Sequence, residues 1–262
     1  MNNLLKATAV ASLLGLSAGA NAAVTTVGVA TWDPSIEPID FTSNGQVAQW
    51  FSTDINGSMG TLTAGEGFDN VVTINGSGSS VIGSYLSGSG TYSDINGNKD
   101  NFDNSIDSIP FGKELSFAFG GLLAKADGTF DVSASWIHVY SDTVADYNQN
   151  AVLTLGQAGY VDALDGDLWL EGTFLDLSLT GGATGAGLFV SSTGLALIDM
   201  TAGLAIDYFD EFGTFAGDGY ELTSEATASF LNGGINDNQI STASVTVKGE
   251  TVNIPEPASL AL

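Results

Sequence analysis

The longest run of closely spaced oxygen-bearing side chains lies between residues 94 and 107, and its residue types suit a hard cation such as Ca²⁺. The candidate ligands are Asp94, Asn96, Asn98, Asp100 and Asp107. Read from Asn96 to Asp107, the run resembles the alternating ligand positions of an EF-hand loop. It departs from that pattern because it starts on Asn, ends on Asp in place of a bidentate Glu, and has no flanking helix pattern. Two interpretations stay open, a calcium-binding loop or a solvated acidic hairpin loop.

Paired carboxylates are the second chemistry to consider, because glycoside hydrolysis needs two of them. Two stretches concentrate acids, namely Asp162, Asp165, Asp167 and Glu171 in one, and Asp207, Asp210 and Glu211 in the other. The chain carries 30 acids in 262 residues, so neighbouring carboxylates arise anywhere by chance. These clusters therefore do not predict a glycosidase.

Nucleophilic catalysis finds little support in the residue types. A triad needs a base beside the nucleophile, and the single histidine, His138, continues one face of an alternating segment. The chain has no cysteine, so thiol catalysis, thiolate metal sites and disulfides are excluded. Gly112-Lys113 is followed by Glu114 where a phosphate-binding loop needs Ser or Thr. We predict that the protein is not an enzyme, has no catalytic residues, and needs no cofactor; calcium is the one ligand of this kind that stays open.

Charge excludes several classes of partner. Five basic residues oppose the 30 acids, giving a formal net charge of −25. All five are lysines, so the bidentate arginine clamp for phosphate is missing. A polyanion of this kind has no electrostatic footprint for nucleic acid and is repelled by anionic lipid. An extracellular polysaccharide stays open as a partner, directly or through divalent cations.

Aromatic side chains near predicted strand ends suggest an alternative function as a carbohydrate-binding module. Trp32 and Trp50 are the candidate glycan contacts, because an exposed indole face can stack on a sugar. Trp136 shares the apolar face of its segment with Phe130, which predicts a core position instead.

The elements that would hold these residues are strands. Glu114–Phe119, Thr129–Tyr140, Leu175–Leu179 and Ala243–Val247 alternate apolar and polar residues, the pattern of antiparallel strands with one buried face. Asn-Gly and Asp-Gly pairs, which favour hairpin turns, recur through the chain; Asn44-Gly45 and Asn96-Gly97 are two of them. We predict an all-β fold: a single antiparallel β-sandwich or partly closed barrel with hairpin turns and at most one short helix, whose best candidate is Asp199–Phe209.

The amino-terminal end, residues 1–22, reads as a secretory signal peptide. Lys6 precedes the apolar run Ala7–Ala20, which is too short to span a membrane with ease. The small residues Ala20 and Ala22 predict cleavage before Ala23. Signal peptidase is the expected partner, and residues 23–250 form the expected β-rich extracellular domain.

The other end, residues 251–262, resembles a linker and the start of a PEP-CTERM sorting signal. Pro255, Glu256 and Pro257 are followed by Ala258-Ser-Leu-Ala-Leu262. In that family the triplet precedes a membrane helix and an Arg-rich cluster, and an exosortase recognises the tail. Only five residues follow the triplet here, without Arg, so we expect a chain that continues past Leu262, a trimmed tail or a degenerate signal. No stable membrane span is expected in the chain as given.

The interior is similar to flocculation-associated PEP-CTERM proteins in its glycine and aromatic punctuation. The similar segments are Gly83–Leu86, Gly88, Gly90, Asp94–Gly97, Gly112–Gly121, Gly203–Ala205 and Tyr208–Asp210. This resemblance implies a secreted protein of the bacterial surface or extracellular matrix, associated with exopolysaccharide in biofilm or flocs.

Overall fold

A computed structural model describes residues 24–34, 41–52, 55, 85–96, 107–125, 129–149, 161–183, 189–209, 222–230, 240–249 and 251. Within the strands, the side chains of residues 50–52, 179–183, 189–193, 222–230 and 240–243 are not described. Several predicted positions lie outside the described residues: the cleavage-site residues Ala20, Ala22 and Ala23, the sorting residues Pro255, Glu256 and Pro257, and the candidate ligands Asn98 and Asp100.

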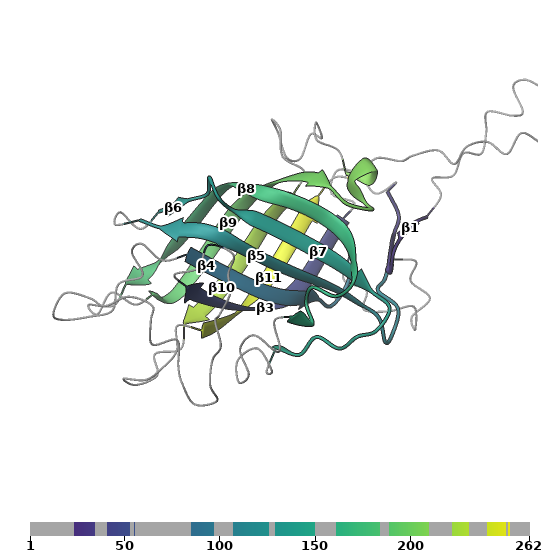
Figure 1. Cartoon of the computed structure of the whole chain (residues 1–262), viewed down its shortest axis with the longest axis horizontal. Helices are drawn as coiled ribbons and strands as arrows, with labels where there is room; N and C mark the ends of the chain where they lie inside the picture. Colours follow the sequence, from purple (N-terminus) through teal and green to yellow (C-terminus); the bar gives the residue numbers. More distant parts are fainter. Residues whose placement is uncertain are drawn as a thin grey trace, which may run out of the picture.

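The described chain is built from strands with one short 3-10 helix (Figure 1). Their bounds are β1 Thr25–Val27, β2 Ala30–Trp32, β3 Phe41–Ser52, β4 Tyr85–Tyr92, β5 Glu114–Ala124, β6 Phe130–Asp131, β7 Trp136–Asp142, β8 Asp167–Ala183, β9 Phe189–Ala202, η2 Ile206–Tyr208, β10 Leu222–Phe230 and β11 Ile240–Gly249. None of the helices in this described part is long and apolar enough to cross a membrane.

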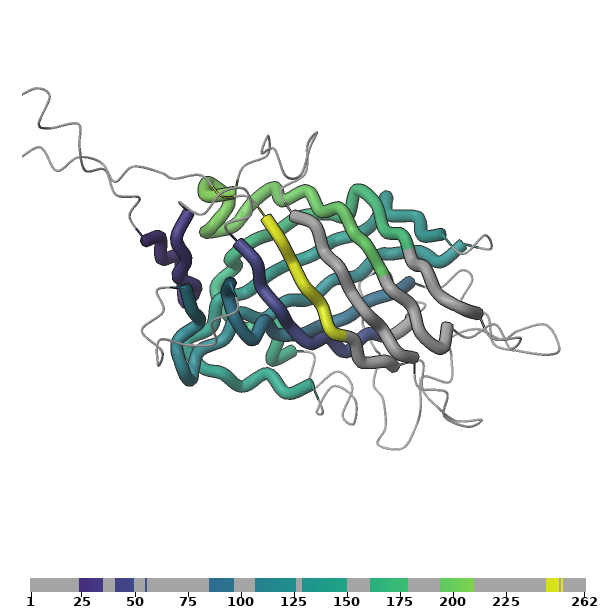
Figure 2. The backbone as a smooth tube through the Cα atoms, turned by 180° about the vertical axis from the view of Figure 1, so that it is seen from behind, coloured from purple at the N-terminus to yellow at the C-terminus, as the bar shows by residue number. Residues whose placement is uncertain are grey.

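One antiparallel sheet closes on itself. Its strand order is β4-β3-β11-β10-β9-β8-β7-β5-β6, and β4 also pairs with β5. Apart from the short β6, strands that follow one another in the chain are neighbours, and β11 returns to pair with β3. Both views show the curled sheet enclosing one interior (Figures 1 and 2). The all-β prediction is confirmed, and the arrangement is a barrel rather than two stacked sheets.

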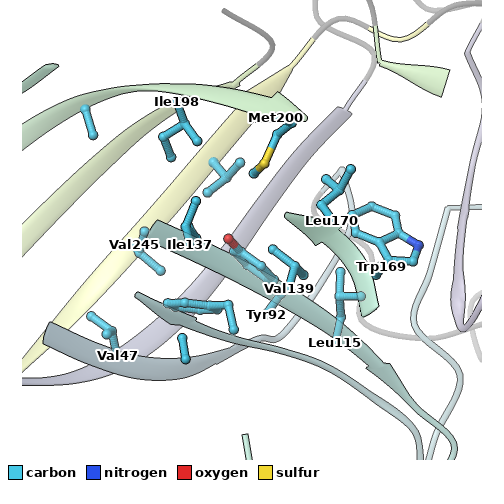
Figure 3. Close-up of a cluster of buried hydrophobic side chains, with 14 of the residues drawn as sticks. Val47, Tyr92, Leu115, Ile137, Val139, Trp169, Leu170, Ile198, Met200 and Val245 are labelled. Atoms are coloured by element: carbon cyan, nitrogen blue, oxygen red, sulfur yellow. The ribbon is translucent and has the colours of Figure 1, made fainter. Parts of the chain in front are cut away.

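Alternation along each strand decides which side chains fill the interior. On β7, Ile137, Val139 and Ser141 are buried while their chain neighbours stay half-exposed. Val245 and Val247 of β11 are buried as the sequence predicted. Figure 3 shows Ile137, Val139 and Val245 converging with side chains from β3, β4, β5, β8 and β9. An eight-stranded barrel is just wide enough for side chains to fill its interior.

Two glycines on β4 make room for two aromatic rings of β5. Gly88 and Gly90 lie opposite Phe119 and Phe117 in the sheet register. A Cβ atom at Gly90 would lie 2.6 Å from the Phe117 ring and 2.2 Å from the carbonyl oxygen of Gln46. The absence of a side chain therefore lets the rings lie across β4, which gives these glycines a packing role.

The β1–β2 hairpin covers one end of the barrel, at the edge of both views (Figures 1 and 2). Its last residue, Trp32, is 0% exposed and packs among the rings of Phe41, Trp169, Tyr208 and Phe209 at centroid distances of 5.7–6.2 Å. The Trp32 indole N–H donates to the Thr251 hydroxyl at 3.0 Å. Thr251, predicted to begin a linker, is thus a buried part of the fold.

Four local predictions are corrected by the structure. Asn44-Gly45 is not a turn but lies inside β3. Glycine suits position 45 because a Cβ atom there would lie only 2.4 Å from the Thr91 carbonyl oxygen. Thr129–Tyr140 is two strands, separated by a turn in which the Ser135 N–H donates to the Val132 carbonyl at 2.9 Å.

The other two corrections concern β8 and β9. Leu175 is 45% exposed, because a register shift between Phe174 and Asp176 reverses the alternation at that point. The predicted helix Asp199–Phe209 is wrong: β9 continues to Ala202, and only Ile206–Tyr208 forms a 3-10 turn. Gly203, with φ of 117°, supplies the backbone conformation between them.

Replacing Gly90 by Ala tests the packing across β4. We expect a loss of about 2–3 kcal/mol in the free energy of unfolding, because the new methyl group meets a backbone oxygen that cannot move aside. Thr91→Ala, at the next residue on the opposite face, is the control and should cost less than about 1 kcal/mol. Equal losses in denaturant titrations of the two variants would contradict this account.

Candidate functional site

Three carboxylates from neighbouring elements meet at one edge of the barrel. Glu114 is the first residue of β5 and lies directly opposite Asp142, the last residue of β7. Asp146 joins them from the connection that follows β7. Ligand oxygens of the three side chains lie within 4.8 Å of one another. Like charges directly opposite each other destabilise a sheet, so this arrangement carries a cost that ordinary strand pairing avoids.

The connection after β7 is held against β4 and β5 by hydrogen bonds. The Ala145 N–H donates to the Gly112 carbonyl at 3.0 Å. The Tyr147 N–H is 3.3 Å from both carboxylate oxygens of Glu114, and the Tyr147 hydroxyl donates to the Ser89 carbonyl at 2.7 Å. Further along, the Ser116 hydroxyl donates to the Ala163 carbonyl at 3.1 Å. The connection therefore covers Glu114, which is only 6% exposed.

Burial dominates the electrostatics of this acidic cluster, which we define as Glu114, Asp142, Asp146 and Asp165. Burial raises the pKa of Glu114 to about 7. The hydrogen bond from the Tyr147 N–H lowers this pKa, and the charges of Asp146, Asp142 and Asp165 raise it. Desolvation also raises the pKa values of Asp146 and Asp165, the latter with help from a hydrogen bond to Asp142. Burial and the repulsion between like charges therefore make the folded chain less stable when all of these carboxyl groups are ionised.

Carboxylate oxygens are the ligands that Ca²⁺ prefers, and Glu114, Asp142 and Asp146 are the described acids whose geometry suits a metal ion. The sequence prediction missed this group because its members are distant in the chain. The only sequence signal was that Glu114 begins one alternating segment and Asp142 closely follows the next. Catalysis by Glu114 is disfavoured, since its carboxyl group is covered by the connection and accepts from a backbone N–H.

Glu114→Gln tests the charge strain of the acidic cluster. A carboxyl group whose folded pKa is raised contributes stability at low pH that is lost as pH rises from 4.5 to about 7. For Glu114 this loss is at most about 3 kcal/mol. We expect the variant to unfold at higher denaturant than the natural chain above pH 7, and to lose this advantage near pH 4.5.

His138, whose pKa is lowered by burial, contributes an opposite pH slope, so the difference between the two proteins is the informative quantity. Urea titrations across that pH range measure it. A difference that does not change with pH would contradict the raised pKa of Glu114.

The predicted calcium segment is only partly described, and its described members bind the protein's own backbone. A carboxylate oxygen of Asp94 accepts from the Asn44 backbone and side-chain N–H groups at 3.2 and 3.0 Å. The Asn96 side-chain oxygen accepts from the Thr42 N–H at 2.7 Å. One carboxylate oxygen of Asp107 accepts from the Asp33 N–H at 2.7 Å, and the other from the Asn96 amide at 3.3 Å.

These hydrogen bonds connect residues 94–96 to the start of β3, and Asp107 to the residue that follows β2. Asp94 and Asp107 are both buried, at 7% and 6% exposure. Asn96 adopts a positive φ of 51°, as its Asn-Gly turn signal indicated. The structure thus gives Asp94, Asn96 and Asp107 a structural role, and calcium binding by this segment stays a prediction.

Asp94→Ala separates the two interpretations of this segment. We expect a loss of about 1–3 kcal/mol in unfolding free energy, because the Asn44 donors lose their acceptor. The loss should be the same with added calcium and with chelator. Asp94→Asn, which keeps one side-chain oxygen, is the control and should retain most of the stability. A loss that disappears in chelator would instead support a calcium ligand.

The predicted glycan contacts fare differently. Trp32 is wrong as a surface platform, since its ring is fully buried in the aromatic cluster at the end of the barrel. Trp50 lies in β3 opposite Ile240 and Ser87, but its side chain is outside the described ones. Trp136, predicted to be core, is only partly buried. The alternating pattern predicted that Trp136 shares a face with Phe130, but the turn at residues 132–135 separates the two.

A second group of side chains that could contact a ligand lies on the half-exposed face of β7. Trp136, His138 and Tyr140 alternate with buried residues, and Glu171 of β8 lies opposite His138. The Tyr140 hydroxyl is 3.3 Å from His138 Nδ1, and His138 Nε2 is 3.8 Å from Glu171 Oε1. We call these four residues the β7 stripe. Of the acids considered for glycoside hydrolysis, Glu171 belongs to this stripe and Asp165 to the acidic cluster, so they serve separate sites.

Comparison with protein-family models, with curated proteins and with solved structures gave no match. The two groups of residues described above, the acidic cluster and the β7 stripe, are therefore interpreted from their geometry and chemistry. The resemblance of the tail and interior to PEP-CTERM proteins stays a prediction from sequence.

Proposed function

We propose that this chain is a secreted, non-enzymatic protein of the bacterial surface or extracellular matrix. Signal peptidase and an exosortase would process it during export, reading the end of its signal peptide and its PEP-CTERM-like tail. In the matrix it associates with exopolysaccharide in a biofilm or in flocs. The tail and signal support the export route, and the charge and fold support the matrix role.

The observation that carries the matrix role is the accumulation of acids with little opposite charge. The chain has a net charge of −25, and the fold adds strain by placing Glu114, Asp142 and Asp146 together. A barrel with a packed interior keeps these acids in place as the surroundings change. Such a polyanion stays soluble alone, while divalent cations can link it to other acidic polymers.

Deleting the gene in the source bacterium tests the proposal. We expect weaker flocs or biofilm, and less protein held in the matrix fraction, than in the parent strain. Complementation with the full chain should restore both. Complementation with Pro255→Ala and Pro257→Ala together should leave the protein folded but change its distribution between matrix and medium. Flocs and biofilm of unchanged mass and shear resistance in the deletion strain would contradict the proposal.

A carbohydrate-binding module is the second candidate, and a specific observation favours it. The β7 stripe gathers three aromatic rings and a carboxylate on a partly exposed sheet face. It replaces the buried Trp32 as the candidate contact for a glycan. The two candidates are compatible, because a matrix protein can hold its polysaccharide through a defined surface.

A further inference from the structure

The β7 stripe is a continuous row of aromatic rings. Trp136 and His138 have ring centroids 5.1 Å apart, and His138 and Tyr140 have centroids 6.1 Å apart. The three residues occupy every second position of β7, so the strand itself sets their direction and spacing. Their neighbours Ile137 and Val139 are buried, which fixes the row on the other face of the sheet.

The sheet beside the row provides a firm floor. Gly120 of β5 lies opposite Trp136, and a Cβ atom at Gly120 would lie 2.7 Å from the indole ring. Glycine therefore allows the indole to lie against the strand. Ala118 and Ser116, opposite His138 and Tyr140, are small and buried. The Trp136 ring thus lies over Gly120 of the neighbouring strand, which restricts the positions open to the ring before any ligand binds.

Polar atoms border the rings. Glu171 keeps 45% of its side chain exposed beside His138, which is 31% exposed. Burial lowers the pKa of His138, and Glu171 opposes this shift only in part, so the imidazole is neutral near pH 7. Its Nδ1 already faces the Tyr140 hydroxyl at 3.3 Å, while Nε2 lies 3.8 Å from Glu171 Oε1, so Nε2 is the nitrogen that the imidazole can offer to a ligand. No hydrogen bond to the Trp136 indole N–H is found among the described residues. The row therefore combines apolar ring surface with donors and acceptors suited to hydroxyl groups.

We propose that the β7 stripe binds an uncharged polysaccharide, with sugar rings stacked on Trp136 and Tyr140 and hydroxyl groups bonded to Glu171 and His138. This rests on the proposed association with exopolysaccharide and names its contact surface. The stripe contains an acidic side chain, Glu171, and no lysine, so it offers no opposite charge to an anionic chain. A cationic chain would be attracted over the whole acidic surface and would not select the stripe.

Affinity electrophoresis of the purified protein tests this inference, using gels that contain hydroxyethyl cellulose, dextran or mannan as uncharged polymers. We expect at least one of them to retard the protein, with little change when the salt concentration rises. Trp136→Ala should weaken binding roughly tenfold, which corresponds to about 1.4 kcal/mol. Tyr140→Ala and Glu171→Gln should each weaken it several-fold. Phe111→Ala, which removes an aromatic ring that is 85% exposed outside the stripe, should leave binding unchanged.

Circular dichroism and a melting scan accompany each variant, because Trp136 also packs on Gly120. If Trp136→Ala does not fold, Tyr140→Ala and Glu171→Gln decide the question. The inference is overturned if none of the uncharged polymers retards the protein, or if folded variants bind as well as the natural chain. It is also overturned if binding occurs only to chitosan and disappears in salt, or only to alginate with calcium.

The failure of this inference is distinguishable from failure of the proposed function. If no polysaccharide binds in gels and the stripe variants restore flocs fully in the deletion strain, the binding role of the stripe is rejected. The matrix role of the protein is then kept. A deletion strain with unchanged flocs removes the matrix role, even where the purified protein binds a polysaccharide.

Discussion

Closure of the sheet is the constraint on which the rest of this structure depends. The pairing of β11 with β3 joins Val245 to Gly45 across the length of the chain, and β4 with β5 completes the ring. Once the ring is closed, every strand has an inner and an outer face, and alternation assigns each side chain to one of them. The interior then has to be filled, which explains why Gly90 yields its space to Phe117.

Closure also determines the chemistry of the outer face. It sets β5 beside β7 in the register that places Glu114 opposite Asp142, and Gly120 opposite Trp136. At one end of the strand pair this produces a buried carboxyl group, that of Glu114, with a raised pKa; at the other end it places the Trp136 ring against Gly120. The two sites therefore belong to one strand pair, and the connection after β7 covers the first of them while the β7 stripe stays partly exposed.

Several of the residues that resemble flocculation-associated proteins have packing roles in the structure. Gly88 and Gly90 accommodate two phenylalanine rings. Gly203 lies against the backbone of Trp169, and a Cβ atom at position 203 would be 2.4 Å from the Trp169 carbonyl oxygen. Tyr208 and Phe209 pack against Trp32 at the end of the barrel. A glycine and aromatic pattern of this kind specifies how a small barrel is filled, and says less about what its surface binds.

The sequence by itself determined the fold class, because alternation and turn residues are local properties and most of them hold in the structure. It also determined the charge and the missing cysteine and arginine, and with them the excluded chemistries. Tertiary structure alone decided the faces: the turn at 132–135 brought Trp136 to a partly exposed position, and a register shift exposed Leu175. It alone buried Trp32, and it gathered Glu114, Asp142 and Asp146. Contacts between residues far apart in the chain depend on strand register, and register is set by the closure of the whole sheet rather than by any one segment.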